Sequence, residues 1–155
     1  MRSADANTAR AIVDANAFMT LATADADGLP WASPVWFSPA GYREFFWVSD
    51  PQARHSRNLA VRPQLAIVIF DSQVRPGEGQ GVYMTAVAEQ LEGTAIEAGL
   101  RVFSERSIAQ GLPVWGPEDV QAPARHRLYR ATVSEHSVLR ADRDERIAVN
   151  PQSGV

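Results

Sequence analysis

Apolar and polar residues alternate along much of the chain with the two-residue period of β-strands. The pattern predicts strands at Phe18–Ala24, Trp31–Phe37, Arg43–Ser49, Val82–Gln90 and Arg127–Val133. A continuous apolar run bounded by turn residues predicts a sixth strand at Leu65–Phe70, covered on both faces. The second strand places Val35 and Phe37 on one face and Trp36 on the other. Because Pro34 in this strand has no N–H for a ladder, we expect the strand to lie at an edge or to carry a bulge.

Three helices are predicted between these strands. Thr8 can cap the first, which ends before Phe18. Asp50 and Pro51 open a second, short and basic helix that runs to about Val61 and stops before Pro63. Residues 94–97 have the form of a capping box and begin a third helix, which continues to about Ser107.

Strands without regular helical crossovers indicate a mostly β fold with added helices, built around an antiparallel β-barrel. We expect one domain over residues 1–141, followed by a polar tail at 142–155. Asp25–Gly28 is a turn signal in which Gly28 supplies a positive φ. Gly77, Gly79 and Gly81 precede a strand rather than a helix, so they predict a flexible hairpin loop and not a phosphate loop.

Composition excludes several classes of function. The chain has 155 residues and a net charge of -3, which argues against a nucleic-acid-binding surface. It has no cysteine, and its three histidines lack the spacing of a metal site, so we expect no metal. No apolar run has the length of a membrane span and no secretory signal is seen, so the expected location is the cytoplasm. Nothing specifies a catalytic acid, base or nucleophile.

The basic helix after the third strand is the strongest candidate site. Arg54, Arg57 and Asn58 share a helical face, His55 is adjacent, and Ser49 lies at the strand exit. Guanidinium groups near a helix start suit a phosphate group. A solvated basic helix face explains the same pattern, and the aromatic second strand is equally consistent with a flat ligand or an ordinary barrel core.

Two segments carry a resemblance to a known family. FMTLATADADGLPWASPVWF at 18–37 and FFWVSDPQARHSRNLAVRPQLAIVIF at 45–70 resemble the pyridoxamine 5′-phosphate oxidase-like, flavin-binding split-barrel family. The order of a Leu-Ala-Thr strand, an Asp-Gly turn, a Ser-Pro-Val-Trp-Phe strand and an Arg-Asn-Leu helix matches the family pattern. The resemblance implies a six-stranded antiparallel split β-barrel. It also implies a homodimer with two cofactor sites at the subunit interface, holding FMN or deazaflavin F420.

The resemblance assigns nine cofactor-binding residues. Those expected to line the flavin ring are Ser33, Pro34, Val35 and Trp36, and those expected to face the phosphate are Val48, Ser49, Arg54, His55 and Arg57. The family usually has lysine at the position of His55. The chain also lacks the C-terminal substrate-binding segment of true pyridoxamine phosphate oxidases, so that specific activity is not expected.

The function expected on this basis is an FMN-dependent oxidoreductase that transfers hydride between the flavin and a small organic substrate. An F420-dependent reductase of the same fold is an alternative. A non-catalytic module that binds flavin or haem is a second alternative, for which the histidine at position 55 is the sequence support.

Overall fold

The computed structural model describes residues 2–140 and 142–152. Its helices are α1 (Arg2–Ala15), α2 (Arg54–Val61), α3 (Ala95–Ala109) and a 3-10 turn at Pro117–Asp119. Its strands are β1 (Phe18–Ala24), β2 (Pro30–Trp36), β3 (Ser38–Ala40), β4 (Glu44–Ser49), β5 (Gln64–Phe70), β6 (Gly81–Gln90), β7 (Arg127–Arg140) and β8 (Glu145–Val149).

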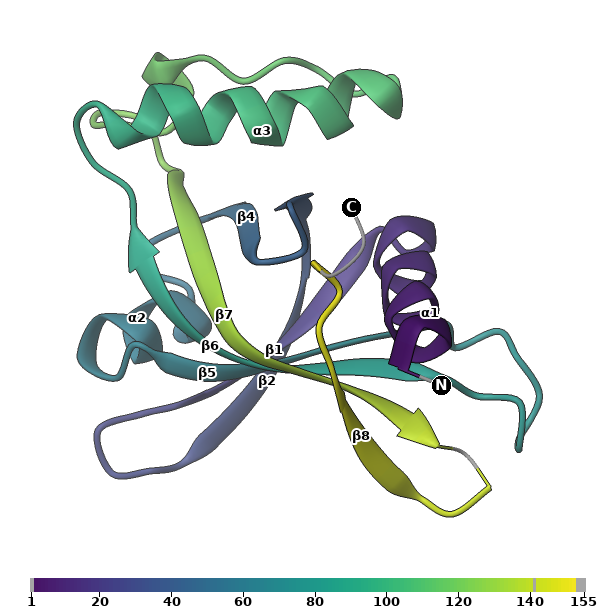
Figure 1. The fold of residues 1–155 in the computed structure, drawn as a ribbon. Coiled ribbons are helices and arrows are strands. Elements are labelled where there is room, and N and C mark those ends of the chain that lie inside the picture. Colours follow the sequence, from purple (N-terminus) through teal and green to yellow (C-terminus); the bar gives the residue numbers. More distant parts are fainter. Residues whose placement is uncertain (1, 141, 153–155) are drawn as a thin grey trace.

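The strands form one antiparallel sheet that curls into a half-barrel (Figure 1). Its order is β2-β1-β5-β6-β7-β4-β3, with β8 paired to the second half of β7. β2 is therefore an edge strand, as Pro34 predicts. No ladder joins β2 to β4 in the described chain, although the two strands are neighbours, so the barrel is split between them.

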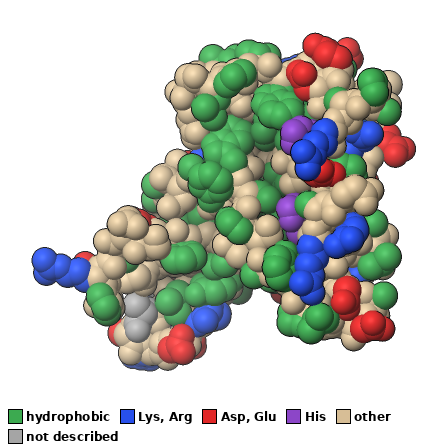
Figure 2. All heavy atoms as spheres, turned by 180° about the vertical axis from the view of Figure 1, so that it is seen from behind, with side chains coloured by type: hydrophobic (Ala, Val, Ile, Leu, Met, Phe, Trp, Pro, Cys, Tyr) green, Lys and Arg blue, Asp and Glu red, His purple; other side chains and the backbone are tan. Residues whose placement is uncertain are grey.

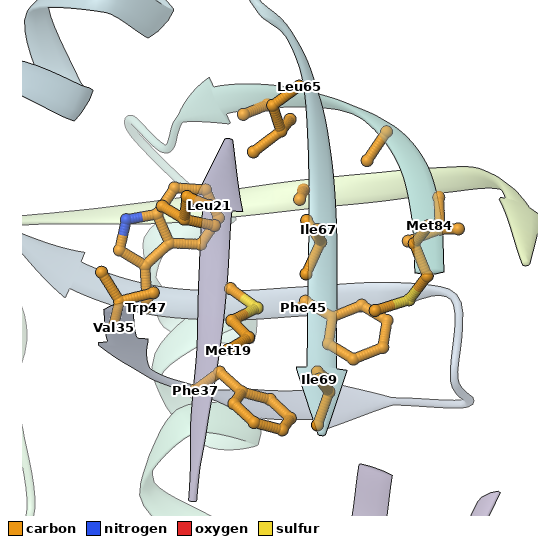
Figure 3. Packing of buried hydrophobic residues seen from close by; sticks show 14 of the residues in the cluster. Met19, Leu21, Val35, Phe37, Phe45, Trp47, Leu65, Ile67, Ile69 and Met84 are labelled. Carbon is orange, nitrogen blue, oxygen red and sulfur yellow. The ribbon is translucent and has the colours of Figure 1, made fainter. Parts of the chain in front are cut away.

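The inner face of the curled sheet holds the main core (Figure 3). Met19 and Leu21 from β1, Phe45 and Trp47 from β4, and Ile67 from β5 point into it and are fully buried. These residues occupy alternate positions in their strands, so each strand turns one face to the core. α1 adds Ala9 and Val13 to the same core.

α3 packs on the outer face of β4 and β7 (Figure 1). Phe46 and Leu128 point outward from the sheet and meet Leu100 and Phe103 of the helix, forming an outer cluster with Leu91, Ile96 and Val120. Arg106 ties α3 to the rest of the molecule, because its guanidinium donates to the carbonyls of Phe37 (2.7 Å) and Asn16 (2.6 Å). The helix thus has a fixed position over one end of the sheet.

The predicted mostly β architecture with added helices is confirmed, and all six predicted strands are present. Two short strands, β3 and β8, were not predicted, and β8 lies in the segment expected to be a polar tail. The first helix does not begin at Thr8: this residue lies within α1, where its hydroxyl donates to the Ala4 carbonyl (3.0 Å). The Asp-Gly turn is present, with Gly28 at φ +86°.

Candidate functional site

A pocket of about 720 Å³ opens at the split between β2 and β4. Its floor comes from these two strands at the split and from the first turn of α2, and its other walls come from α3 and the segment after it. The lining residues are Phe18, Pro34, Val35, Trp36, Val48, Ser49, His55, Phe103, Ser107, Leu112, Pro113, Val114, Trp115, Asp119 and His126. Both its size and its largely apolar lining are typical of a site for a small organic molecule.

Six of the nine predicted site residues line this pocket. They are Pro34, Val35, Trp36, Val48, Ser49 and His55. They meet there because β2 and β4 lie on the two sides of the split and α2 follows β4 after a short turn. The structure thus brings together residues that are up to 21 positions apart, from 34 to 55. Their role as cofactor ligands stays a prediction.

The other three predicted residues do not line the pocket. Ser33 directly precedes Pro34 in β2 but is not part of the lining. Arg54 stacks on Trp31, with its guanidinium carbon 4.3 Å from the centre of the indole. Arg57 is exposed to solvent. Both arginines nevertheless belong to α2, the helix whose first turn contributes His55 to the pocket.

His55 lies inside the molecule and not on the exposed side of the helix. Only 9% of the residue is exposed, and its Nε2 lies 2.9 Å from Ser49 Oγ. Burial lowers the pKa of His55 below its usual value of 6.5, because the charged imidazolium loses hydration. At neutral pH His55 therefore offers a hydrogen bond rather than a positive charge.

Asn58 also points inward rather than sharing the face of Arg54 and Arg57. Its Nδ2 donates to Thr23 Oγ1 of β1 (3.0 Å), and this contact pins α2 to the sheet. The helix begins at Arg54 and not at Pro51. Asp50 does not cap it: one carboxylate oxygen accepts the Gln52 N–H (2.8 Å), and the other forms an ion pair with Arg125 Nε (2.7 Å).

α2 begins without a side-chain cap. The residue before it, Ala53, makes no side-chain hydrogen bond to the first turn. The first N–H groups of a helix have no partner within the helix, and together they favour an anion. The start of α2 therefore combines free amide donors with two arginines and the Ser49–His55 pair.

The edge of β2 offers further main-chain groups to the pocket. The Phe37 N–H donates to the Ala17 carbonyl (3.3 Å). This bond shows which residues of β2 direct their main-chain groups toward β1. Hydrogen-bonded pairs alternate along an antiparallel ladder, so Val35 also pairs with β1. The main-chain groups of Trp36 and Pro34 are then directed to the free edge, where a flat ligand can use them.

The sequence did not identify the residues that α3 and the following segment contribute. These are Phe103, Ser107, Leu112, Pro113, Val114, Trp115, Asp119 and His126, together with Phe18 at the start of β1. The one available signal was Trp115, the single large aromatic residue in an irregular stretch. On the face shown in Figure 2, histidine side chains lie between arginine side chains and a broad apolar area.

Few ionisable side chains line the pocket. Within residues 2–140 and 142–152, no group of three or more histidine and carboxylate side chains could hold a metal ion. Neither arginine nor lysine lines the pocket, and Asp119 is its one carboxylate. No helix in the described part of the chain is long and apolar enough to span a bilayer.

Solved structures of low sequence identity share this fold. The heme binding protein from Mycobacterium smegmatis superposes with a TM-score of 0.73 at 23% identity, over 95% of this chain and 58% of that one. HutZ, the heme storage protein from Vibrio cholerae, has a TM-score of 0.64 at 24% identity, over 81% of this chain and 87% of that one.

Sequence comparison identifies the family. The pyridoxine/pyridoxamine 5′-phosphate oxidase of Burkholderia cenocepacia (strain HI2424) is 30% identical over 104 residues, which are 64% of this chain and 44% of the relative. The chain thus spans less than half the length of this relative. The family model for pyridoxamine 5′-phosphate oxidase matches residues 6–139. Because that match covers most of the sequence, the chain belongs to the pyridoxamine 5′-phosphate oxidase family.

Proposed function

We propose that this protein binds FMN in the pocket at the split and acts as an oxidoreductase on a small organic substrate. The observation that carries the proposal is that the free edge of β2 and the uncapped start of α2 lie at one largely apolar pocket. A flavin needs main-chain hydrogen-bonding groups along the polar edge of its ring, and donors or positive charge around its phosphate. When bound, the flavin supplies the hydride chemistry, and the protein positions and shields it.

The phosphate end of the proposed site is the start of α2. Ser49 and His55 supply neutral hydrogen bonds, and the helix amides supply further donors. The positive charge comes from Arg54 and Arg57. All fifteen basic residues of the chain are arginines, so no lysine is available to replace the one that the family usually has at position 55. Guanidinium groups suit this role because they contact phosphate through two parallel hydrogen bonds.

The ring end of the proposed site is the β2 edge. The main-chain groups of Pro34 and Trp36 that face away from β1 match the polar edge of a flavin, and Val35 and Val48 provide apolar surface. F420 carries a similar ring and phosphate, so the same residues would hold it. Water is kept from the ring by the apolar side chains of α3 and the segment after it.

Haem is the second candidate cofactor. His55 and His126 both line an otherwise apolar pocket, and imidazole is a common axial ligand of haem iron. The fold neighbours from Mycobacterium smegmatis and Vibrio cholerae, which are named for haem binding and haem storage, support this candidate. Of the two histidines, His55 is engaged with Ser49, whereas the ring of His126 lies edge to face against Trp115.

Titration of the purified protein tests these candidates. We expect FMN to bind at micromolar concentration, with F420 and haemin as parallel titrations. Replacing Arg54 and Arg57 together with alanine should weaken FMN binding at least about tenfold, because two charge-assisted contacts to phosphate are lost. Riboflavin, which has no phosphate, should bind the variant and the wild type equally. The matched control is the Arg75→Ala, Arg101→Ala double variant, which removes the same charge from exposed positions away from the pocket.

Three results would decide against parts of the proposal. If FMN and F420 fail to bind at micromolar concentration, the flavin function is wrong. If FMN binds but both double variants weaken it equally, the phosphate lies elsewhere. If haemin alone binds and His126→Ala abolishes its absorbance shift, the haem candidate replaces the flavin.

A homodimer is part of the same proposal. The outer side of the sheet carries a second hollow of about 1030 Å³, whose lining includes Ala22, Ala66, Val68 and Tyr83. Small and apolar residues at exposed strand positions suit contact with a second copy of the sheet. Light scattering on the eluting protein should give twice the 17.0 kDa mass of the chain, and a monomer at high micromolar concentration would contradict this. Amine cross-linkers are a poor substitute because the chain has no lysine.

A further inference from the structure

Four aromatic side chains form a continuous wall along the α3 side of the pocket. The ring centres of Trp36 and Phe103 are 5.0 Å apart at an interplanar angle of 82°. Phe103 and Trp115 follow at 6.1 Å and 87°, and Trp115 and His126 at 5.8 Å and 87°. Each neighbour is edge to face, which is a favourable arrangement for aromatic pairs. All four line the pocket, and we call them the aromatic wall.

The aromatic wall is distinct from most of the proposed flavin-binding residues. Trp36 is the one member that is also among them. Phe103 lies on α3, Trp115 follows that helix, and His126 precedes β7. Leu112 and Val114 extend the apolar surface to the mouth of the pocket, where they are 44% and 63% exposed. The pocket therefore has apolar surface beyond what a ring on the β2 edge would use.

The charges around the aromatic wall limit what it can accept. No arginine lines the pocket. The arginines next to lining residues of this wall are engaged elsewhere: Arg106 donates to the carbonyls of Phe37 and Asn16, Arg125 pairs with Asp50, and Arg127 donates to the carbonyls of Ala124 and His126. Asp119 is the one carboxylate of the lining, and its Oδ2 already accepts the Gly116 N–H (2.8 Å). A phosphate or sulfonate placed against this wall would lose hydration without gaining a cation. His126 and the indole N–H of Trp115 can hydrogen-bond a neutral polar atom, whereas Trp36 Nε1 already donates to Gln110 Oε1 (3.0 Å).

We propose that the aromatic wall is a substrate subsite for an uncharged, planar aromatic molecule with a carbonyl or similar acceptor at its His126 end. The inference rests on the proposed function, in which the cofactor occupies the β2 and α2 side of the same pocket. Flat aromatic molecules gain the most from stacked and edge-to-face contacts with such a wall. The same wall disfavours phosphorylated substrates, including pyridoxamine 5′-phosphate.

The probe for this subsite is 1,4-naphthoquinone, with 1,4-naphthoquinone-2-sulfonate as its anionic counterpart. The chain has neither cysteine nor lysine, so no side-chain thiol or amine is present for a quinone to modify covalently. Quenching of tryptophan fluorescence in the purified protein should report binding, because Trp36 and Trp115 are both in the wall. We expect the sulfonate to bind at least about tenfold more weakly than the neutral quinone, about 1.4 kcal/mol.

Substitutions at Trp115 separate a ring contact from a general apolar contact. Trp115→Leu keeps apolar volume in the outer cluster but removes the ring, and should raise the Kd for 1,4-naphthoquinone roughly tenfold. Trp115→Phe should restore most of the affinity, and Trp36 still reports binding in both variants. Ile108→Ala is the control, because this 61% exposed residue lies on α3 outside the wall and should leave the Kd unchanged.

The outcomes distinguish the subsite from the cofactor site. Equal affinity for the two quinones, or no effect of Trp115→Leu, would overturn the subsite. Mutual displacement of FMN and naphthoquinone would also overturn it, because the wall would then belong to the cofactor. A Kd that rises with protein concentration would mean that a second copy covers the wall, with the same consequence. Selective binding of the neutral quinone by a protein that binds no flavin would support the subsite and reject only the flavin function.

Discussion

Replacing Gly99 with alanine tests how closely α3 is held against the sheet. A Cβ at this position would lie 2.7 Å from Leu91 Cδ1, 2.9 Å from Leu128 Cδ2 and 3.3 Å from Phe46 Cε1. All three neighbours are buried in the outer cluster, so their side chains have no space in solvent to turn into. Either α3 moves outward or the leucines adopt poorer rotamers. Both responses would disturb the helix that forms one wall of the pocket.

Two opposing terms set the expected size of the effect. Alanine is favoured over glycine inside a helix by about 0.8–1.0 kcal/mol. Overpacking a close-packed core by a methyl group costs about 1–3 kcal/mol, and here the new atom meets two side chains below 3.0 Å. We therefore expect the Gly99→Ala variant to lose about 1–2 kcal/mol in free energy of unfolding.

Chemical denaturation followed by circular dichroism measures this change. Ala98→Gly is the matched control, because Ala98 is exposed in the same turn of α3 and reports helix propensity without the steric contact. In a Leu91→Ala background the closest contact is gone, so Gly99→Ala should cost less there than in the wild type. A Gly99→Ala protein as stable as the wild type or more so, with no coupling to position 91, would refute the reasoning.

Two further predictions concern the inner face of α2 and the buried histidines. Asn58→Ala should lower the free energy of unfolding by about 1–3 kcal/mol, because the buried contact to Thr23 is lost; a change below about 0.5 kcal/mol in urea denaturation would contradict this. Burial lowers the pKa of His55 and His136, so the unfolded chain takes up protons first as the pH falls below 6.5. Stability should be full above pH 6.5 and decrease towards the folded pKa by at most about 1.4 kcal/mol per pH unit for each histidine. In His55→Gln, denaturation between pH 7 and pH 5 should show a smaller slope, and an unchanged slope would count against the role of His55.

The strands of the sheet were predictable because half-buried strands leave an alternating pattern. Pro34 even indicated which strand lies at the edge. The two strands that were missed leave no such pattern. β3 has three residues, too few to show alternation, and β8 is polar at its start and stays largely exposed along its pairing with β7. Each pairs with the strand next to it in the chain, β3 with β4 and β8 with β7, so shortness and exposure, rather than distance in the sequence, hid them.

The β2 and β4 half of the pocket was predictable, whereas the α3 half was not. Residues 112–126 have no helical or strand periodicity, so nothing in the sequence indicates which of their side chains face inward. Phe103 fits the helical pattern of α3, so its burial could be predicted. The same face of the helix, however, contributes both to the outer cluster and to the pocket lining. Only the position of α3 on the sheet decides which atoms reach the cavity.

The orientation of α2 was encoded in the sequence, although the basic residues obscured it. Leu59 is an apolar residue of this helix that must be buried, and residues three or four positions before a given residue share its helical face. His55 lies four positions before Leu59, and Asn58 beside it is also buried, whereas Arg54 and Arg57 fall outside that face. α2 thus has two faces. The buried face carries neutral polar side chains, and the face toward solvent carries the two arginines. An anionic ligand would therefore meet hydrogen-bond donors within the pocket and find its countercharge only where the pocket opens to solvent.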